Sequence, residues 1–285
     1  VDADGRLEIL DLDATADDAT TTAVETGGIE TLNITSSDVN KTTGKALTLT
    51  VDELEAYEVT SVTVSGSNKV TISELDLVSA GTNANKTTAA LRAAEKVTID
   101  ASDATALFSL NTTETGVIAV TGGSGGIDVD MNGTATKADV ITGGSATTDI
   151  VTFLDSAGGA ATQEVTATGV ETIEVETVNN GDDTISLLYV TGATQVKIMN
   201  DDGTTVSNVD GEKIYIETSA TTGDFSNEVI VIDTLTSTTK GSNTTFEIGH
   251  IMSTTGQGDA DSLDATVLQT DTPTMTIIDP DNFEL

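Results

Sequence analysis

The feature that most constrains the fold is a short pattern in which two aliphatic residues flank one other residue. It appears as "ETLNI" near the start and returns as "ETIEV" 141 residues later. A period of two is the signature of a β-strand with one buried and one wet face. We therefore expect many such strands. The clear aliphatic pairs are Leu32 with Ile34, Val62 with Val64, Val70 with Ile72, Val97 with Ile99, Ile173 with Val175, Val196 with Ile198 and Ile214 with Ile216.

Weaker copies fill the gaps at uneven intervals, with Gly, Ser, Asn, Asp or Thr between them. They are Leu47 with Leu49, Ile118 with Val120, Ile127 with Val129, Val151 with Phe153, Ile185 with Leu187 and Phe246 with Ile248. Uneven spacing favours rungs of unequal length or the strands of a β-sandwich. A sandwich usually carries core aromatics, whereas aromatic residues make up 3% of this chain. We predict an all-β, irregular right-handed parallel β-helix (a β-solenoid), with β-sandwich domains as the alternative.

Two segments have helical character within this strand pattern. "VDELEAYE" suggests a short helix near 51–58, and the Ala-rich "TTAALRAAEK" suggests another near 87–96. Both are too short to be stable alone, so we expect them to dock as caps or corners. A length of 285 residues allows one large or two modest domains. We expect an N-terminal solenoid half over 1–155, containing both helices, and a C-terminal β-rich half over 156–285.

The charge balance restricts the classes of binding partner. There are 47 acidic and 11 basic residues, a net charge of −36. Nucleic acid and anionic membrane surfaces are therefore poor partners, because both attract clustered Lys and Arg. Divalent cations are the natural counter-charge, although acidity also simply keeps a secreted protein soluble. The chain has no cysteine, and no apolar run long enough to span a membrane.

The residues that most enzymes need are scarce. Without cysteine there is no thiol nucleophile, and the single histidine, His250, cannot supply a zinc-protease motif. No G-x-S-x-G elbow occurs for a serine hydrolase. The many acidic residues do not exclude a pair of carboxylates for glycoside cleavage, but such sites usually add aromatic residues that hold the sugar. We expect no enzymatic activity.

Several phrases resemble the repeats of a bacterial family. The segments over 97–123 and 137–153, "VTIDASDATALFSLNTTETGVIAVTGG" and "KADVITGGSATTDIVTF", resemble the strand repeats of surface-layer (S-layer) proteins of the RTX type. "GIETLNIT" and "GVETIEVET" resemble another phrase of that family. Together these phrases touch about half of the chain. The resemblance implies a secreted, calcium-bound β-solenoid that tiles the cell surface, exported by a type I system.

The calcium-binding nonapeptide of that family, G-G-x-G-x-D-x-U-x, occurs here only in altered forms. In "GGSGGID" and "GGSATTD" the aspartate comes one position late, and "GQGDADSL" is one residue too long. "NNGDDTISL" fits best, with Gly181, Asp183 and Ile185 at the G, D and U positions. The resemblance thus implies Ca²⁺ ligands among Asp128, Asp130, Asp149, Asp182, Asp183, Asp259 and Asp261. The alternative for each is an ordinary solvated turn.

The expected function follows from this resemblance. We expect a structural, extracellular protein of the bacterial cell surface that self-assembles into a calcium-dependent S-layer lattice. Its partners are other copies of itself and a cell-surface polysaccharide. The alternatives are an adhesin or other secreted RTX-like repeat protein that acts as a spacer or binding module, and a secreted hydrolase with an RTX-like tail. The chain starts without methionine or a visible signal peptide, so we expect a mature or excised segment.

Overall fold

The computed structural model consists of strands and the corners that join them. It describes residues 6–10, 18–21, 24–25, 31–37, 46, 48–55, 59–76, 96–112, 116–156, 162–178, 183–200, 204–209, 212–218, 229–233, 245–252, 264–268 and 274–278. Every regular element within these residues is a β-strand, and none is a helix. The all-β class predicted from the alternating pattern is confirmed.

The strands form three sheets, in which every pairing is parallel. The first sheet runs β1 (Arg6–Leu10), β4 (Thr31–Thr35), β7 (Ser61–Gly66), β9 (Lys96–Ala104), β11 (Val117–Thr121), β13 (Val140–Thr142), β16 (Thr166–Thr168), β19 (Val190–Thr191). The second runs β2 (Asp18–Thr21), β5 (Thr48–Val51), β8 (Val70–Asp76), β10 (Phe108–Thr112), β12 (Ile127–Asp130), β14 (Ile150–Ser156), β17 (Thr172–Val178), β20 (Gln195–Asn200), β22 (Lys213–Thr218), β24 (Thr245–Met252), β26 (Thr274–Ile278), with β3 (Val24–Glu25) and β6 (Leu54–Glu55) beside it. The third runs β15 (Thr162–Glu164), β18 (Thr184–Ser186), β21 (Thr204–Ser207), β23 (Val229–Asp233), β25 (Asp264–Leu268).

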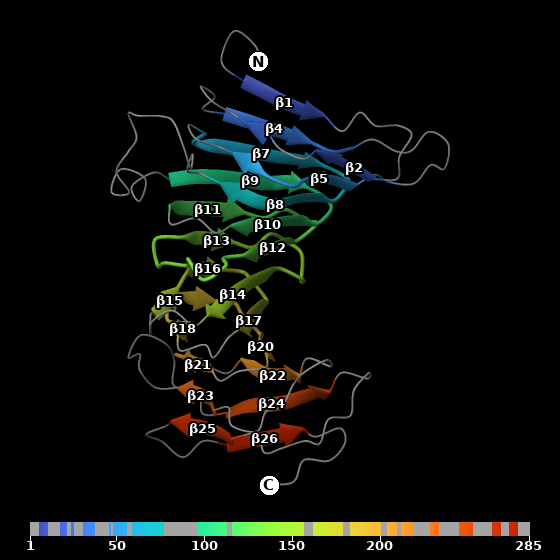
Figure 1. Cartoon of the computed structure of the whole chain (residues 1–285). Helices are drawn as coiled ribbons and strands as arrows, with labels where there is room; N and C mark the ends of the chain where they lie inside the picture. The colour runs from blue at the N-terminus through green and yellow to red at the C-terminus, as the bar shows by residue number, and fades with distance from the viewer. Residues whose placement is uncertain are drawn as a thin grey trace, which may run out of the picture.

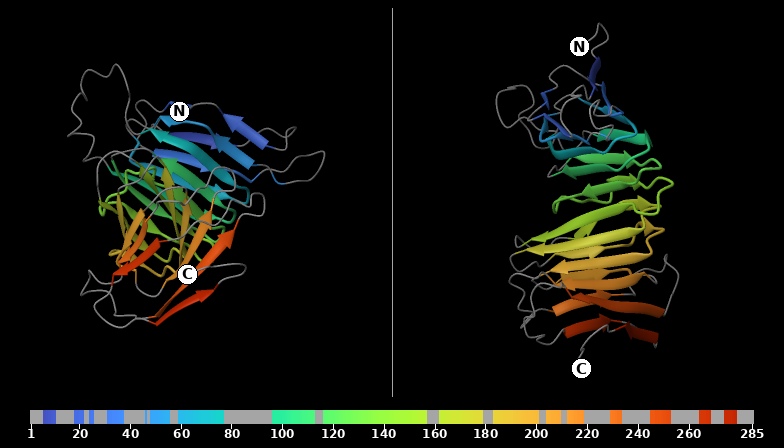
Figure 2. Two further views of the ribbon diagram at one scale, coloured as in Figure 1. Left: turned by 60° about the horizontal axis from the view of Figure 1, so that its bottom comes forward. Right: turned by 90° about the vertical axis from the view of Figure 1, so that its right-hand side faces the viewer.

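The chain winds from sheet to sheet as it advances. From β7 to β14, successive strands alternate between the first and second sheets. The third sheet starts at β15 and takes part in every later turn, while the first sheet ends at β19. The strands stack along one axis, with β1 and β26 at opposite ends (Figures 1 and 2). This arrangement is the predicted parallel β-solenoid and not the alternative sandwich.

The rungs of this solenoid differ in length. In the second sheet Asp128 pairs with Ile150, 22 positions further on. Gln195 pairs with Lys213 after 18 positions, and Ile214 pairs with Ile248 after 34. The strands stay paired although the sequence has no fixed period, and the register shifts once between β8 and β10 and once between β7 and β9.

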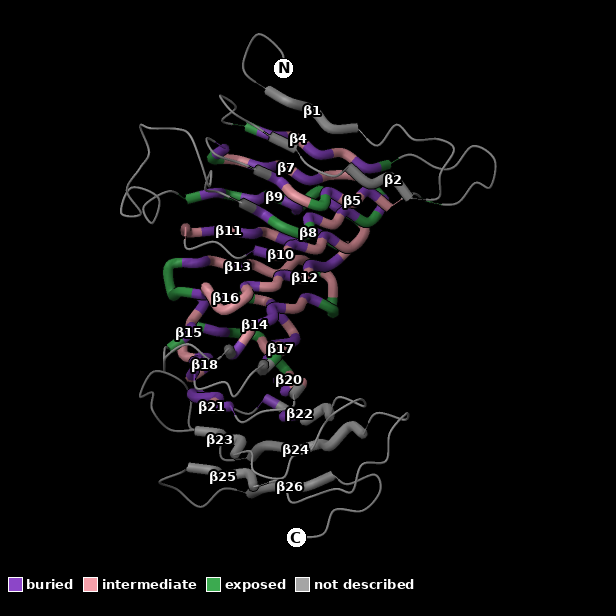
Figure 3. Tube along the Cα trace, in the orientation of Figure 1, coloured by how far each residue is buried: buried purple, intermediate pink, exposed green. Residues whose placement is uncertain are grey.

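The aliphatic pairs form the core. Of the clear pairs, every side chain that the structure describes is 2% exposed or less: Leu32, Ile34, Val62, Val64, Val70, Ile72, Val97, Ile99, Ile173, Val175, Val196, Ile198 and Ile214. Parallel pairing stacks them in rows, so that Ile99 lies between Val62 and Val120. Figure 3 shows the alternation of buried and less buried residues along the strands. Each fully buried aliphatic side chain contributes about 1.5–3 kcal/mol, which lets the fold form with few aromatics.

The helix predicted near 51–58 is wrong in its described part. Strand β5 ends at Val51, the chain bends at Asp52, and β6 begins at Leu54. Val51 and Leu54 are both fully buried, and Leu54 pairs with Leu75 in β8. Continuing the ladder of aliphatic residues outweighs the weak helix propensity of this segment. Of the helix predicted near 87–96, residues 87–95 lie outside the described residues, and Lys96 begins β9.

Glycines pack successive corners of the first sheet closely together. The backbone N–H of Gly143 donates to the carbonyl of Thr168 at 2.9 Å. A Cβ on Gly144 would lie 1.8 Å from the carbonyl oxygen of Gly123 in the preceding rung. The segment "TGGSGG" (121–126) contributes Gly123 to this stacked corner, and a Cβ on Gly123 would lie 2.3 Å from the carbonyl oxygen of Ala104, so only glycine fits there.

Candidate functional site

The structure describes four of the seven aspartates predicted to bind calcium, and it places them in different environments. Asp128 and Asp130 alternate with buried residues on β12 and face outward. Asp149 and Asp183 are buried at corners, each directly before a strand. Asp182, Asp259 and Asp261 lie outside the described residues.

Asp128 and Asp130 belong to a group of carboxylates on the outer face of the second sheet. This outer acidic cluster consists of Asp128, Asp130, Glu174 and Glu176. Burial raises the pKa of Asp128, and the charge of Glu174 raises it further, against an opposing effect of Lys69. Burial also raises the pKa of Asp130 and of Glu176, and the other three carboxylates add to the shift of Glu176. Like charges are thus held together on one face.

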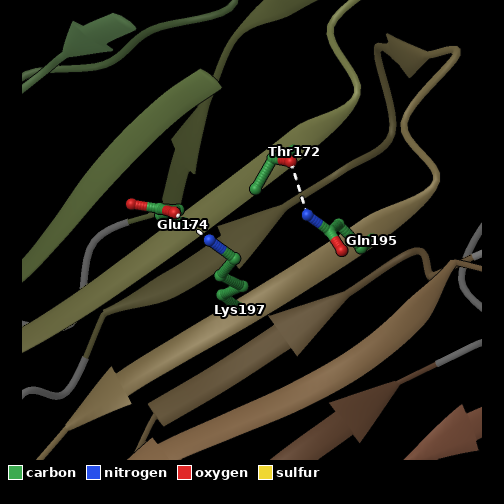
Figure 4. A network of polar contacts seen from close by, with 4 residues as sticks. All are labelled: Thr172, Glu174, Gln195 and Lys197. Carbon is green, nitrogen blue, oxygen red and sulfur yellow. Dashed lines mark hydrogen bonds and ion pairs between the residues drawn. The ribbon is translucent and has the colours of Figure 1, made fainter. Parts of the chain in front are cut away.

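Polar contacts link the neighbouring strands around this cluster. Lys197 Nζ on β20 lies 2.7 Å from Glu174 Oε1 on β17. Beside this ion pair, Gln195 Nε2 donates to Thr172 Oγ1 at 2.7 Å (Figure 4). The Asn132 backbone N–H donates to Asp130 Oδ1 at 3.0 Å. The cluster is therefore built into the sheet surface, and Lys197 only partly offsets its charge.

Buried aspartates fasten one rung to the next. Asp139 Oδ1 accepts a hydrogen bond from the Ile118 backbone N–H at 2.8 Å, and Oδ2 accepts one from Thr136 at 2.8 Å. Asp149 Oδ1 and Oδ2 accept from the N–H groups of Ile127 and Gly144 at 2.8 and 2.9 Å. Burial raises the pKa of Asp139 and of Asp149 although these hydrogen bonds lower it. The carboxylates act as acceptors for backbone donors at the corners.

The sequence contains a signal for these buried positions. Asp139, Asp149 and Asp183 each stand two residues before a buried aliphatic residue of a strand: Ile141, Val151 and Ile185. Because side chains alternate between faces, an aspartate at that spacing points inward with the aliphatic residue. Asp139 was not predicted, because the candidate residues came from the calcium-binding motif and not from the alternation of side chains along the strands.

A second buried network lies inside the solenoid, and we call it the interior corner. It consists of Asp155, Gln163, Asp183 and Thr204. Asp155 Oδ1 accepts from the Asp183 backbone N–H at 3.0 Å, and its Oδ2 accepts from Thr204 Oγ1 at 2.8 Å. Gln163 Nε2 donates to Asp183 Oδ2 at 2.8 Å and to the Leu154 carbonyl at 2.7 Å. Sequence reasoning found Asp183 but missed the other three residues.

These environments differ in how well they suit calcium. Within the described residues, no group of three or more His, Cys, Asp or Glu side chains is placed to hold a metal ion. At Asp149 both carboxylate oxygens already accept N–H groups. In the interior corner both oxygens of Asp155 likewise accept hydrogen bonds, whereas Gln163 Oε1 is buried without a hydrogen-bond partner.

Comparison of the chain with protein-family models, with curated proteins and with solved structures finds no match. In the part of the chain that the structure describes, no helix is long and apolar enough to cross a membrane.

Proposed function

We propose that the chain is a structural, non-enzymatic protein of the bacterial cell surface that self-assembles into a calcium-dependent S-layer lattice. The observation that carries this proposal is the outer acidic cluster on the wet face of the solenoid. A stacked aliphatic core supports an extended sheet surface. That surface carries carboxylates whose raised pKa values reflect burial and mutual repulsion.

Repulsion between these carboxylates supports a role for divalent cations. Since no three of these side chains are placed to hold one ion within the described part of the chain, calcium would bridge the carboxylates of Asp128, Asp130 and Glu176 to those of a neighbouring copy, and binding would neutralise their charge. Extracellular modules typically bind calcium with a Kd of about 10⁻⁴–10⁻³ M. A single site at a hundred times its Kd stabilises the folded state by about 2.7 kcal/mol. Such sites fill outside a cell and stay empty inside it.

The difference between calcium occupancy outside and inside a cell supports the proposed export, folding and assembly of the chain. The chain would stay unfolded during export through a type I system and fold on release. Its partners would be other copies of itself, which meet through the wet faces, and a cell-surface polysaccharide.

Electron microscopy of the full chain tests the proposal. We expect ordered sheets or tubes with CaCl₂ and dispersed particles with MgCl₂ or chelator. The variant Asp128→Asn/Asp130→Asn should need more calcium to assemble, whereas Asp103→Asn, an exposed aspartate on β9, should behave like the parent chain. Dispersed rods at every calcium concentration contradict the lattice. Rods that bind a glycan would instead indicate the adhesin, and hydrolysis lost on one Asp or Glu substitution would indicate an enzyme.

A further inference from the structure

The outer faces of the first and second sheets differ in charge. On β11, β13 and β16 of the first sheet, the side chains that alternate with the core are all uncharged. On β12, which follows β11 in the chain but belongs to the second sheet, the outward residues are Asp128 and Asp130. We call the uncharged group the neutral face, and it consists of Val117, Ala119, Thr121, Val140, Thr142, Thr166 and Thr168.

Parallel pairing aligns the neutral face in columns along the solenoid. Thr98 pairs with Ala119, and Ala119 pairs with Val140. Thr166 continues this middle column, and Tyr189 lies next in it. Tyr189 is the large apolar side chain that the described residues expose, at 40%. Contiguous exposed apolar and aromatic side chains mark interaction surfaces.

Two opposite charges flank the middle column on β9. Lys96 and Asp100 lie on either side of Thr98, and both are exposed. Hydrogen bonds from the hydroxyl and the backbone N–H of Ser102 lower the pKa of Asp100, so its carboxylate is charged at neutral pH. Within the described part of the chain Lys96 forms no ion pair. A separation of four positions spans roughly 13 Å along a strand, so Lys96 and Asp100 of one copy do not pair with each other.

A second copy of the chain suits this arrangement. The net charge of −36 opposes the approach of another copy, and an uncharged face is where approach costs least. A two-fold axis through the middle column, parallel to the solenoid, would place Lys96 of one copy opposite Asp100 of the other, and the reverse. The face is thus complementary to itself in charge, as a two-fold interface requires.

We propose that the neutral face is a contact between two copies of the chain, related by a two-fold axis and joined by two reciprocal pairs of Lys96 with Asp100. The inference rests on the self-assembly in the proposed function and adds a contact that needs no bridging calcium. Because the outer acidic cluster lies on a different sheet, each copy would then have two contact surfaces. Two different contacts extend an assembly beyond a pair.

Disulfide crosslinking tests this contact, because the chain contains no cysteine of its own. Ala119→Cys places a thiol in the middle column, beside the two-fold axis. Thr162→Cys places one at the exposed start of β15 in the third sheet. In CaCl₂ with a mild oxidant, and with the fold checked by circular dichroism, Ala119→Cys should form covalent dimers at least about tenfold faster than Thr162→Cys.

Charge reversal tests the orientation of the two copies. In the Ala119→Cys chain, Lys96→Asp places like charges opposite each other and should slow crosslinking about fivefold or more. Adding Asp100→Lys exchanges the two charges and should restore the rate. Thr162→Asp adds a carboxylate away from the neutral face and should leave the rate unchanged.

Three results would overturn the inference. One is a folded Ala119→Cys chain that crosslinks no faster than Thr162→Cys. Another is an effect of Lys96→Asp that Asp100→Lys does not reverse. The third is binding of a polysaccharide that Val140→Asp abolishes, without crosslinked dimers, because the neutral face would then belong to that partner. If Ala119→Cys does not fold, Val140→Cys places the thiol one rung further along the same column.

The inference and the proposed function can fail separately. Crosslinked dimers of Ala119→Cys without ordered sheets under any condition support the contact and contradict the lattice. Sheets that form from Ala119→Cys without crosslinks, and from Lys96→Asp as readily as from the parent chain, leave the lattice standing and refute the contact.

Discussion

The carboxylate of Asp149 joins two parts of successive rungs: Oδ1 accepts the N–H of Ile127 at 2.8 Å, and Oδ2 accepts the N–H of Gly144 at 2.9 Å. Ile127 begins β12, and Asp149 directly precedes β14, which pairs with it. The aspartate is fully buried. It therefore serves as an internal fastener of the solenoid.

Replacing Asp149 by Asn should destabilise the fold. The amide offers one acceptor oxygen and turns its NH₂ group toward a backbone donor, so one buried N–H loses its partner. We expect the free energy of unfolding to fall by about 1–3 kcal/mol, measured by urea denaturation. Asp103→Asn, on an exposed position, should change it by less than about 0.5 kcal/mol. Equal effects of the two substitutions would refute the fastening role.

The alternation of side chains between the two faces of a strand explains how much of the solenoid could be predicted from the sequence. The period of two around Leu32 and Ile34 indicated the buried face, and the uneven spacing indicated unequal rungs. At Val51 and Leu54 the local sequence favoured a helix, because stacking on Leu75 from another rung is invisible locally. Gln163 and Asp155 carry no motif, and only the winding of the chain brings them together.

Glycine at the stacked corners should be intolerant of substitution. Gly144→Ala would place a Cβ 1.8 Å from the backbone of Gly123, so the corner must shift. We expect a loss of about 1–3 kcal/mol or more, read from thermal unfolding. Gly169→Asn is the matched variant, because Gly169 has a φ of +69° and a Cβ there would lie 3.9 Å from its nearest neighbour, the Gly143 carbonyl oxygen, which is an ordinary contact. Asn tolerates that conformation, so a loss as large as that of Gly144→Ala would contradict the packing argument.

The outer acidic cluster should make the chelated protein more stable in mild acid than at neutral pH. The pKa values of Asp128, Asp130 and Glu176 are raised in the folded state, so the folded chain holds protons that the unfolded chain releases. Stability is therefore present below the ordinary values of 3.8 and 4.5 and is lost as pH rises through the raised pKa values. The lowered pKa of Asp100 acts in the opposite direction.

Denaturation in chelator across the range from about pH 4 to 7 measures this effect. In Asp128→Asn/Asp130→Asn the free energy of unfolding should depend less on pH, because two of the titrating groups are gone. A parent chain whose stability rises with pH over this range would contradict the assignment.

The ion pair between Lys197 and Glu174 should stabilise the folded chain mainly at low salt. Its nitrogen–oxygen distance is 2.7 Å, and the side chains are 29% and 14% exposed. Lys197→Met should lower stability by up to about 1 kcal/mol at low ionic strength and by less at high salt. Lys137→Met, at an exposed position, is the control. A loss that does not depend on salt would point to packing of the lysine stem instead.

The central claim is that calcium drives folding and assembly, and one titration tests it most directly. Circular dichroism and light scattering are recorded together while CaCl₂ is added to the chelated full chain, with MgCl₂ as the control. We predict that strand signal and scattering both rise with calcium in the range of about 10⁻⁴–10⁻³ M and that magnesium does not substitute. Two signals that stay flat throughout the calcium titration would contradict the claim.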